Sequence, residues 1–325
     1  MAGKRVRRIR AFAKINLSLR VLGVRPDGYH ELRTILQSIA LHDTLTIRAV
    51  PGPFQLTCDD PDCPSNSTNL IWRAAEHLWT AAGRRGSPRD ISIDLTKRIP
   101  LQAGLGGGSS DAAAALRALG RMWRVDEAHQ RAAAVALGAD VPYFFEGGTV
   151  LGLERGDLLF PLIDYPDAWV VVALPPFGVS TKEAFGWWDA APAERSVPRA
   201  ERSSFDPSTS SRSSRAKSRD DKLRMSGHRN SLALSLSKGE LGNDLEGAVG
   251  AHHPEITRLI SAMRRAGASH AAMSGSGSAV FGLFARRQEA VRAAEAIASS
   301  RAGRGIVTMM TRTLNRTRYQ ALAAA

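Results

Sequence analysis

The segment from residue 100 to 111 reads Pro-Leu-Gln-Ala-Gly-Leu-Gly-Gly-Gly-Ser-Ser-Asp and runs directly into an alanine-rich helix former. Its glycines, at 104, 106, 107 and 108, let the backbone approach a ligand with no Cβ in the way. The first N–H groups of the helix lack partners and carry partial positive charge, which favours anions. We therefore predict a phosphate-binding loop, with Ser109 and Ser110 at the helix start and Asp111 as its cap or first-turn acid.

Two commoner kinds of glycine loop do not fit this segment. A Walker-type loop ends in Gly-Lys-Ser or Gly-Lys-Thr, whereas this one ends in Gly-Ser-Ser. A dinucleotide-binding fingerprint that starts at Gly104 needs a third glycine at position 109, which is serine. A flexible linker remains a simpler interpretation, but the alternating Ile91, Ile93 and Leu95 before the loop and the helix after it favour phosphate binding.

The first half of the chain predicts a mixture of strands and helices. Alternating apolar residues indicate strands, and a period near 3.6 indicates helices. Strands are expected within residues 9–50, with a separate one at 44–47, and at 91–95 and 149–153. Helices are expected at 69–82, 111–122 and 126–137, the last with Asp126 as its cap.

The second half predicts a different arrangement. An apolar run at 169–174 indicates a buried strand, and further strands are expected at 270–273, 279–284 and 306–311. Helices are expected at 254–265 and 288–299. The order strand, helix, strand, strand, helix, strand is ferredoxin-like. At 325 residues the chain exceeds the usual size of one core, so we expect an α+β protein with domains at 1–165 and 166–325.

Residues 194–238 fit neither domain. They are rich in serine and arginine and have few large apolar side chains, so they cannot bury enough surface to offset chain entropy. We expect a disordered insertion. This segment holds eleven Lys and Arg against five Asp and Glu, and the segment from Lys4 to Arg10 holds five more basic residues. Because these two segments carry most of the net charge of +13, nucleic-acid binding is only an alternative, confined to the insertion.

The sequence shows no pattern typical of a membrane or secreted protein. No apolar stretch reaches about 18 residues, so no membrane span is expected. The basic residues from Lys4 to Arg10 are not followed by an apolar region, which argues against a secretory signal. Cys58 and Cys63 are too few for a zinc site or a disulfide framework. We therefore expect a protein of the reducing cytoplasm.

Four blocks of sequence together resemble one known family. They are Ala13–Leu17 with the nearby Arg25–Leu32, then 100–113, 138–144 and 274–281. In this order they resemble the 4-diphosphocytidyl-2-C-methyl-D-erythritol kinases, which belong to the GHMP kinase superfamily. The glycine loop alone indicates only the superfamily. The first block, with Lys-Ile-Asn-Leu and Asp-Gly-Tyr-His-Glu-Leu, narrows the resemblance to this one family within it.

The resemblance implies a two-lobed GHMP kinase fold, with an N-terminal ATP-binding lobe and a C-terminal ferredoxin-like lobe. It implies transfer of the ATP γ-phosphoryl group to the 2-hydroxyl of 4-diphosphocytidyl-2-C-methyl-D-erythritol, in the non-mevalonate route to isoprenoid precursors. Mg²⁺ is expected with ATP, although no metal ligand is named. A mevalonate- or homoserine-type kinase of the same superfamily remains an alternative.

The same resemblance implies roles for particular residues. Asp140 corresponds to the catalytic aspartate and Lys14 to its lysine partner. The residues implied for the other substrate are Asn16, Tyr29, His30, Phe185, Gly275 and Gly277, with Tyr29 and His30 holding the cytosine and Phe185 stacking on it. Those implied for ATP are Pro100, Leu101, Gln102, Ala103, Gly104, Leu105, Gly106, Gly107, Gly108, Ser109, Ser110, Asn69 and Lys97.

Three of these residues also have simpler interpretations in the sequence alone. Lys14 could be a solvated strand lysine, and Asp140 an ordinary turn acid. Phe185 could be a core residue beside Trp187 and Trp188. The structure decides which neighbours each of them has.

Overall fold

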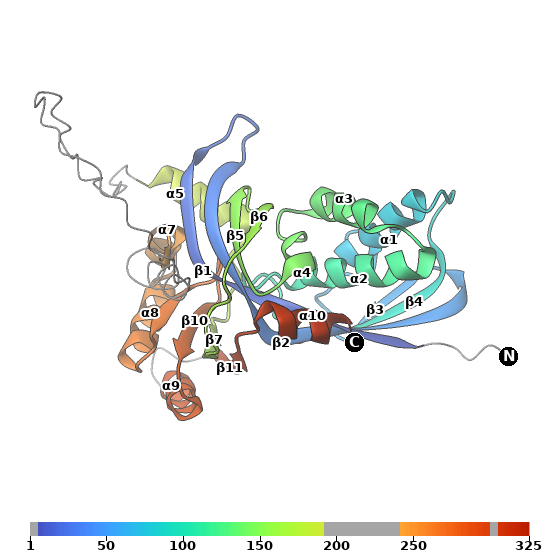
Figure 1. Cartoon of the computed structure of the whole chain (residues 1–325). Helices are drawn as coiled ribbons and strands as arrows, with labels where there is room; N and C mark the ends of the chain where they lie inside the picture. Colours follow the sequence, from blue (N-terminus) through green and yellow to red (C-terminus); the bar gives the residue numbers. More distant parts are fainter. Residues whose placement is uncertain (1–5, 192–240, 300–304, 325) are drawn as a thin grey trace, which may run out of the picture.

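The computed structural model describes residues 6–191, 241–299 and 305–324. These residues form a seven-stranded sheet and a four-stranded sheet, each with its own helices (Figure 1). The two-lobed α+β fold expected from the sequence is confirmed, whereas the domain boundary at 165 stays a prediction. The expected insertion at 194–238 lies outside the described residues. None of the described helices is both long and apolar enough to cross a membrane.

The larger sheet is built on a long antiparallel hairpin. Its strand order is β3-β4-β2-β1-β8, and β5 pairs with both β2 and β6. The strands are β1 (Arg7–Val24), β2 (His30–Pro53), β3 (Gln55–Cys58), β4 (Arg89–Thr96), β5 (Thr149–Glu154), β6 (Leu158–Pro161) and β8 (Gly242–Asn243).

The separate strand expected at 44–47 is part of one continuous strand, β2, so that prediction was wrong. The first part of β2 pairs with β5, from Leu32 to Gln37, and a later part pairs with β4, from Thr44 to Ala49. Register shifts between β1 and β2 bend the hairpin without ending either strand. Because the neighbouring strand changes along β2, the alternation of buried and exposed residues is interrupted, and the sequence of this one strand resembles two.

Four helices lie on one side of this sheet (Figure 1). They are α1 (Leu70–Ala81), α2 (Gly107–Trp123), α3 (Glu127–Leu137) and α4 (Tyr143–Glu146). Small side chains on α2 let neighbouring helices approach it closely, and its alanines belong to the main core of this lobe. The cap expected at Asp126 is present, since it accepts a hydrogen bond from His129 N. Asn69, which was expected inside a helix, is instead the N-cap of α1 and accepts a hydrogen bond from Ile71 N.

The start of α2 corrects two predictions. The helix begins at Gly107 rather than at Asp111, and its N-cap is Gly106 in the left-handed conformation with φ 71°. Asp111 is therefore past the first turn, where its side chain is buried rather than capping. The low helix propensity of glycine concealed the first helical residues.

The smaller sheet has the order β11-β7-β10-β9, which confirms the ferredoxin-like arrangement. Its strands are β7 (Trp169–Leu174), β9 (His270–Met273), β10 (Val280–Phe284) and β11 (Val307–Arg312), and its helices are α8 (Pro254–Arg265) and α9 (Arg287–Ser299). Four of the described helices were not expected from the sequence, namely α4, α5 (Thr181–Ala190), α7 (Leu245–His252) and α10 (Arg316–Ala324). The last of these returns to the first lobe, where Tyr319 Oη donates to Phe144 O at 2.7 Å.

β1 contributes alternate side chains to a core shared by the two lobes and to the candidate site. Ala13, Ile15 and Leu17 are buried in a core that also contains residues of β7, β9 and β10. Because successive strand residues face opposite sides, Lys14 and Asn16 share the other face. The inter-lobe core thus fixes the strand from which both polar side chains project.

His270 provides a test of the packing between the sheets. Its Nε2 is buried with no hydrogen-bond partner in the described part of the chain, and burial lowers its pKa to about 4. Since an unfolded histidine titrates near ~6.5, the unfolding free energy should fall from about pH 6.5 to pH 4, by on the order of 2–3 kcal/mol. His270→Gln should lose this dependence in denaturant titrations, whereas His77→Gln on the exposed side of α1 should keep it. Parallel curves for wild type and His270→Gln would contradict the assignment.

Candidate active site

A buried lysine and a half-exposed aspartate meet at the centre of the site. Lys14 Nζ lies 3.7 Å from Asp140 Oδ2, and the two side chains are 4% and 45% exposed. Lys14 belongs to β1, whereas Asp140 lies in the short connection between α3 and α4. Lys14 is thus no solvated strand lysine, and Asp140 presents a carboxylate to solvent beside a cation.

Asn16 holds the lysine in position from the same face of β1. Lys14 Nζ donates to Asn16 Oδ1 at 2.7 Å, and Asn16 Nδ2 donates to Thr34 Oγ1 at 2.8 Å. Thr34 Oγ1 in turn donates to the backbone oxygen of Ser18 at 2.7 Å. This chain orients the amide so that its oxygen faces the ammonium group.

The two glycine turns contact each other beside this pair. Ser274 Oγ donates to Gly104 O at 2.9 Å, which joins the turn between β9 and β10 to the loop before α2. A Cβ on Gly275 would lie 3.2 Å from both Gly104 O and Lys14 Nζ. Asn243 Nδ2 donates to Gly275 O at 2.7 Å and supports the second turn from below. Residues from both lobes therefore surround Lys14.

The loop at 100–110 presents mainly backbone groups, rather than side chains, to the candidate site. Ala103 and Leu105 are buried in the inter-lobe core, and Ser110 Oγ donates to Phe12 O at 2.7 Å. Leu105 O also accepts a hydrogen bond from Lys14 N at 3.0 Å, which ties the loop to β1. The groups of the loop that remain to face the site are the glycine backbone and the N-terminus of α2, and such groups bind anions.

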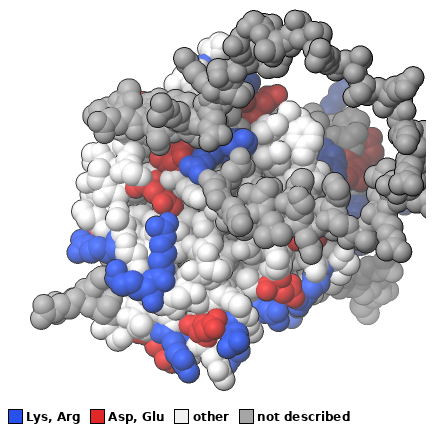
Figure 2. All heavy atoms as spheres, turned by 60° about the vertical axis from the view of Figure 1, so that its left-hand side comes forward, with Lys and Arg blue, Asp and Glu red and all other residues white. Residues whose placement is uncertain are grey.

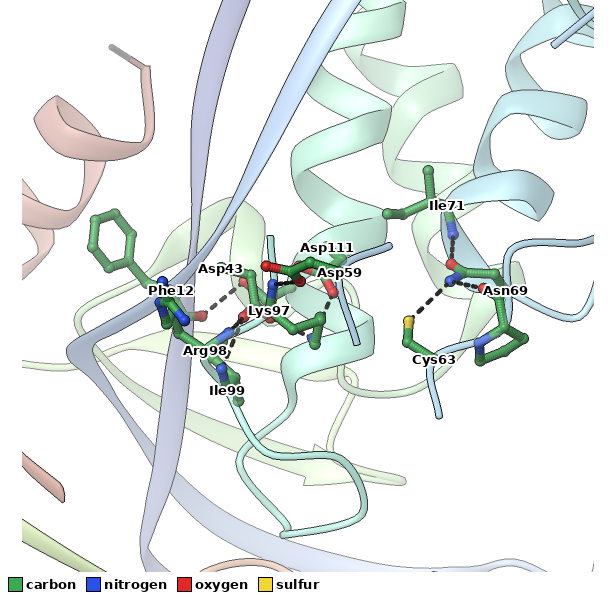
Figure 3. A network of polar contacts seen from close by, with 12 residues as sticks. Phe12, Asp43, Asp59, Cys63, Asn69, Ile71, Lys97, Arg98, Ile99 and Asp111 are labelled. Atoms are coloured by element: carbon green, nitrogen blue, oxygen red, sulfur yellow. Dashed lines mark hydrogen bonds and ion pairs between the residues drawn. The ribbon is translucent and has the colours of Figure 1, made fainter. Parts of the chain in front are cut away.

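Lys97 and Asn69 hold the surroundings of the loop together (Figure 3). The ammonium group of Lys97 is buried and donates to the carboxyl groups of Asp43 and Asp111. The side chain of Asn69 caps α1 and donates to Pro64 O at 2.7 Å. Both side chains are thus used within the protein, and their contact with ATP stays a prediction.

A second group of expected residues forms an aromatic surface at the far end of the β1–β2 hairpin. The rings of His30 and Phe185 stack with centroids 4.4 Å apart and an angle of 25°. His30 Nε2 lies 3.0 Å from Asp189 Oδ1, and the edge of Trp188 meets the imidazole at 5.6 Å. Tyr29 is 56% exposed. The structure brings Phe185 from α5 onto His30, while Trp188 is the buried core residue.

The two groups of residues are separated along the hairpin. Lys14 pairs with Ser38, and His30 lies eight residues before Ser38 on the same strand. At about 3.3 Å per residue, the separation along the strand is at most roughly 26 Å. A long substrate could therefore place a flat ring at His30 and a hydroxyl group near Asp140.

Several residues of the site carried no recognised signal in the sequence. Thr34 and Asp189 are single polar residues within a strand and a helix. Ser274 lies in the Ser-Gly-Ser-Gly-Ser run, which marked a turn but not its contact with Gly104. Their roles arise from partners that are distant in the chain.

Comparison with known proteins agrees with this geometry. The GHMP kinases N terminal domain matches residues 69–148, and the GHMP kinases C terminal family matches 227–302. A 4-diphosphocytidyl-2-C-methyl-D-erythritol kinase of Solibacter usitatus is 39% identical, over 99% of this chain and 93% of its own length. One of Pelotomaculum thermopropionicum is also 39% identical, over 86% of this chain and 90% of its own.

Solved structures give the same result. The crystal structure of a 4-(cytidine 5'-diphospho)-2C-methyl-D-erythritol kinase is 32% identical with a TM-score of 0.69, and the match covers 94% of this chain and 99% of that one. A homoserine kinase from Cytophaga hutchinsonii has a TM-score of 0.66 at 17% identity, over 98% of each chain, which shows a shared fold alone. On its sequence, fold and relatives, the chain belongs to the 4-diphosphocytidyl-2-C-methyl-D-erythritol kinase family of the GHMP kinases.

Proposed function

We propose that this kinase transfers the γ-phosphoryl group of ATP to the 2-hydroxyl of 4-diphosphocytidyl-2-C-methyl-D-erythritol. The products are ADP and the 2-phosphate, in the non-mevalonate route to isoprenoid precursors. The observation that carries the proposal is the Lys14–Asp140 pair, 3.7 Å apart, beside two glycine turns in contact. The family relatives supply the choice of substrate.

Asp140 and Lys14 divide the chemistry of the transfer. The half-exposed carboxylate of Asp140 orients the attacking hydroxyl and accepts its proton. The buried ammonium of Lys14 stabilises negative charge on the transferred group. Because phosphoryl transfer passes through a loose transition state, aiming the hydroxyl matters at least as much as removing its proton.

The glycine loop and the N-terminus of α2 bind the phosphates of ATP through backbone N–H groups. Within residues 6–191, 241–299 and 305–324, no three His, Cys, Asp or Glu side chains are grouped to hold a metal ion. Mg²⁺ is expected to enter with ATP, since this ion is commonly bound through substrate phosphates. When bound, the ion neutralises charge between the phosphates, and we assign no side chain to it.

Phe185 is proposed to support recognition of the cytosine together with Tyr29 and His30. Base–aromatic stacking is worth about 1–3 kcal/mol, so Phe185→Ala should raise KM for the cytidyl substrate by about 5- to 150-fold. The values of kcat and of KM for ATP should change little, because Phe185 lies at the far end of the hairpin from Lys14. Phe160→Ala, at an exposed position on β6, serves as the control. An unchanged KM in Phe185→Ala would remove Phe185 from the site.

The proposed reaction is tested by ADP release from magnesium-ATP with three acceptors in turn. These are 4-diphosphocytidyl-2-C-methyl-D-erythritol, mevalonate and homoserine. We expect release above the ATPase background with the first acceptor alone. Release with mevalonate or homoserine, but not with the cytidyl compound, would assign the chain a different substrate.

Surface charge and the cysteines bear on two further expectations, a nucleic-acid partner and the location of the protein. On the face shown in Figure 2, acidic and basic side chains of the described residues alternate and form no continuous basic surface. We expect no nucleic-acid partner, because most of the net positive charge lies in residues 4–10 and 194–238 and the rest of the sequence is nearly balanced. Cys58 and Cys63 are both free thiols, in keeping with a cytoplasmic location.

A further inference from the structure

Three ionisable residues are buried beside the glycine loop, and the proposed mechanism uses none of them (Figure 3). Asp43 is 0% exposed, Asp111 2% and Lys97 8%. Asp43 lies on β2, Asp111 lies on α2, and Lys97 directly follows β4. We call Asp43, Lys97 and Asp111 the loop anchor.

The hydrogen bonds of the loop anchor leave one atom without a partner. Asp43 accepts from Lys97 Nζ and also from Arg98 N and Ile99 N, the latter at 2.8 Å. Asp111 Oδ2 accepts from Lys97 Nζ at 2.9 Å. The other oxygen, Asp111 Oδ1, is buried and has no donor among the residues that the structure describes. The carboxyl groups of Asp43 and Asp111 both accept from the same Lys97 Nζ, which holds the two acids close together.

The charges do not balance if both carboxyl groups are ionised. One ammonium and two carboxylates would leave a net negative charge in a site closed to water, which costs much free energy. Burial, together with the nearby Asp43, raises the pKa of Asp111. A proton on Asp111 removes the excess charge and lets it donate a hydrogen bond to the Asp43 carboxylate.

Lys97 and Cys63, which lie near Asp111, each keep one protonation state near neutral pH. The two carboxylates raise the pKa of Lys97, so it stays positive. Cys63 faces the loop anchor from the connection after β3, and burial with the nearby Cys58 raises its pKa to about 12, so it stays a neutral thiol. Asp59, on the same connection, accepts a hydrogen bond from Lys97 N at 2.7 Å. Among Lys97, Cys63 and Asp111, Asp111 is therefore the group whose charge can change.

The loop anchor touches both ends of the glycine loop. Asp43 binds the backbone of Arg98 and Ile99, directly before the loop begins at Pro100. A Cβ on Gly107, the first residue of α2, would lie 3.3 Å from Lys97 Nζ. A negative charge on Asp111 would thus lie close to the helix terminus that receives the phosphates, and would oppose them.

We propose that Asp111 is a neutral carboxylic acid in the folded kinase, and that the loop anchor, kept uncharged overall by this proton, positions the glycine loop for ATP. Asp111 is then a positioning residue, because it acts through Lys97 and α2. The role in ATP binding rests on the proposed function, whereas the proton on Asp111 does not.

The proton is tested by carbon-13 NMR of aspartate carboxyl groups in the free protein. At pH 6 we expect one signal of a protonated acid in the wild type that is missing in Asp111→Asn. Asp43→Asn should also lose it, because Asp111 is then the one carboxylate left for Lys97 and ionises. A wild type with every aspartate ionised at pH 6 would overturn the proposal, and this reading does not depend on kinase activity.

The consequence for ATP is tested by calorimetric binding of the analogue adenylyl imidodiphosphate with magnesium, between pH 6 and pH 9. Wild-type affinity should fall by about tenfold as Asp111 ionises, a size expected for one buried charge near the phosphates. Asp111→Asn should show no such fall, while Asp94→Asn, at a more exposed site on β4, should follow the wild type. The same fall in Asp111→Asn would refute the role of this proton. A wild type that keeps the NMR signal but binds no analogue would refute the proposed function instead.

Discussion

Asp140→Asn should lower kcat by about 10²- to 10⁴-fold, the usual contribution of a positioned acid or base. The amide keeps the size of the side chain but cannot accept the hydroxyl proton. The carboxylate is 45% exposed and its one ion pair, to Lys14, is at 3.7 Å, so the fold loses little when it is replaced. Steady-state kinetics with both substrates varied should show KM values within about threefold of the wild type, since the interaction is made mainly in the transition state.

The control for this variant is Asp167→Asn, which removes a half-exposed carboxylate near Arg312 and Arg318, outside the site. It should leave kcat unchanged. Thermal unfolding of both variants should match the wild type within a few degrees. If Asp140→Asn kept more than a tenth of wild-type kcat, Asp140 would not be the group that aims and deprotonates the hydroxyl.

Gly104→Ala should damage both stability and ATP binding, because the two lobes meet at this residue. Its Cβ would lie 2.0 Å from the backbone oxygen of Ser274, and its φ of +72° is unfavourable for any side chain. Left-handed strain of about 1–2 kcal/mol and a displaced backbone worth about 1–3 kcal/mol predict a loss of roughly 2–5 kcal/mol in the unfolding free energy. Denaturant titration measures the loss, and calorimetry with an ATP analogue measures binding.

Gly86→Ala separates the two causes. Gly86 has almost the same φ, +74°, but a Cβ there meets nothing within 4 Å. It should therefore lose only the strain of about 1–2 kcal/mol and should bind the analogue normally. Equal losses in the two variants would mean that the contact between Gly104 and Ser274 contributes nothing to the junction of the lobes.

The sequence alone was enough for features that depend on neighbours along the chain. Glycines at 104–108 followed by an alanine-rich helix indicated a phosphate loop, and Asp126 as a cap indicated the start of the helix that follows it. Apolar alternation predicted a strand through Lys14 and Asn16, and in β1 the two residues share one face because strand geometry has a period of two. The start of α2 was misplaced because glycine carries no helical signal of its own.

Only the tertiary structure decided which of these features meet. The contact of Lys14 with Asp140 joins β1 to a connection far along the chain, and that of Gly104 with Ser274 joins the two lobes. Asp111 looked like a helix cap, yet the packing of α2 against β2 and β4 turned it into a buried partner of Lys97. Local patterns record periodicity, caps and turns, whereas these contacts depend on strand order, register shifts and the shared core of the lobes.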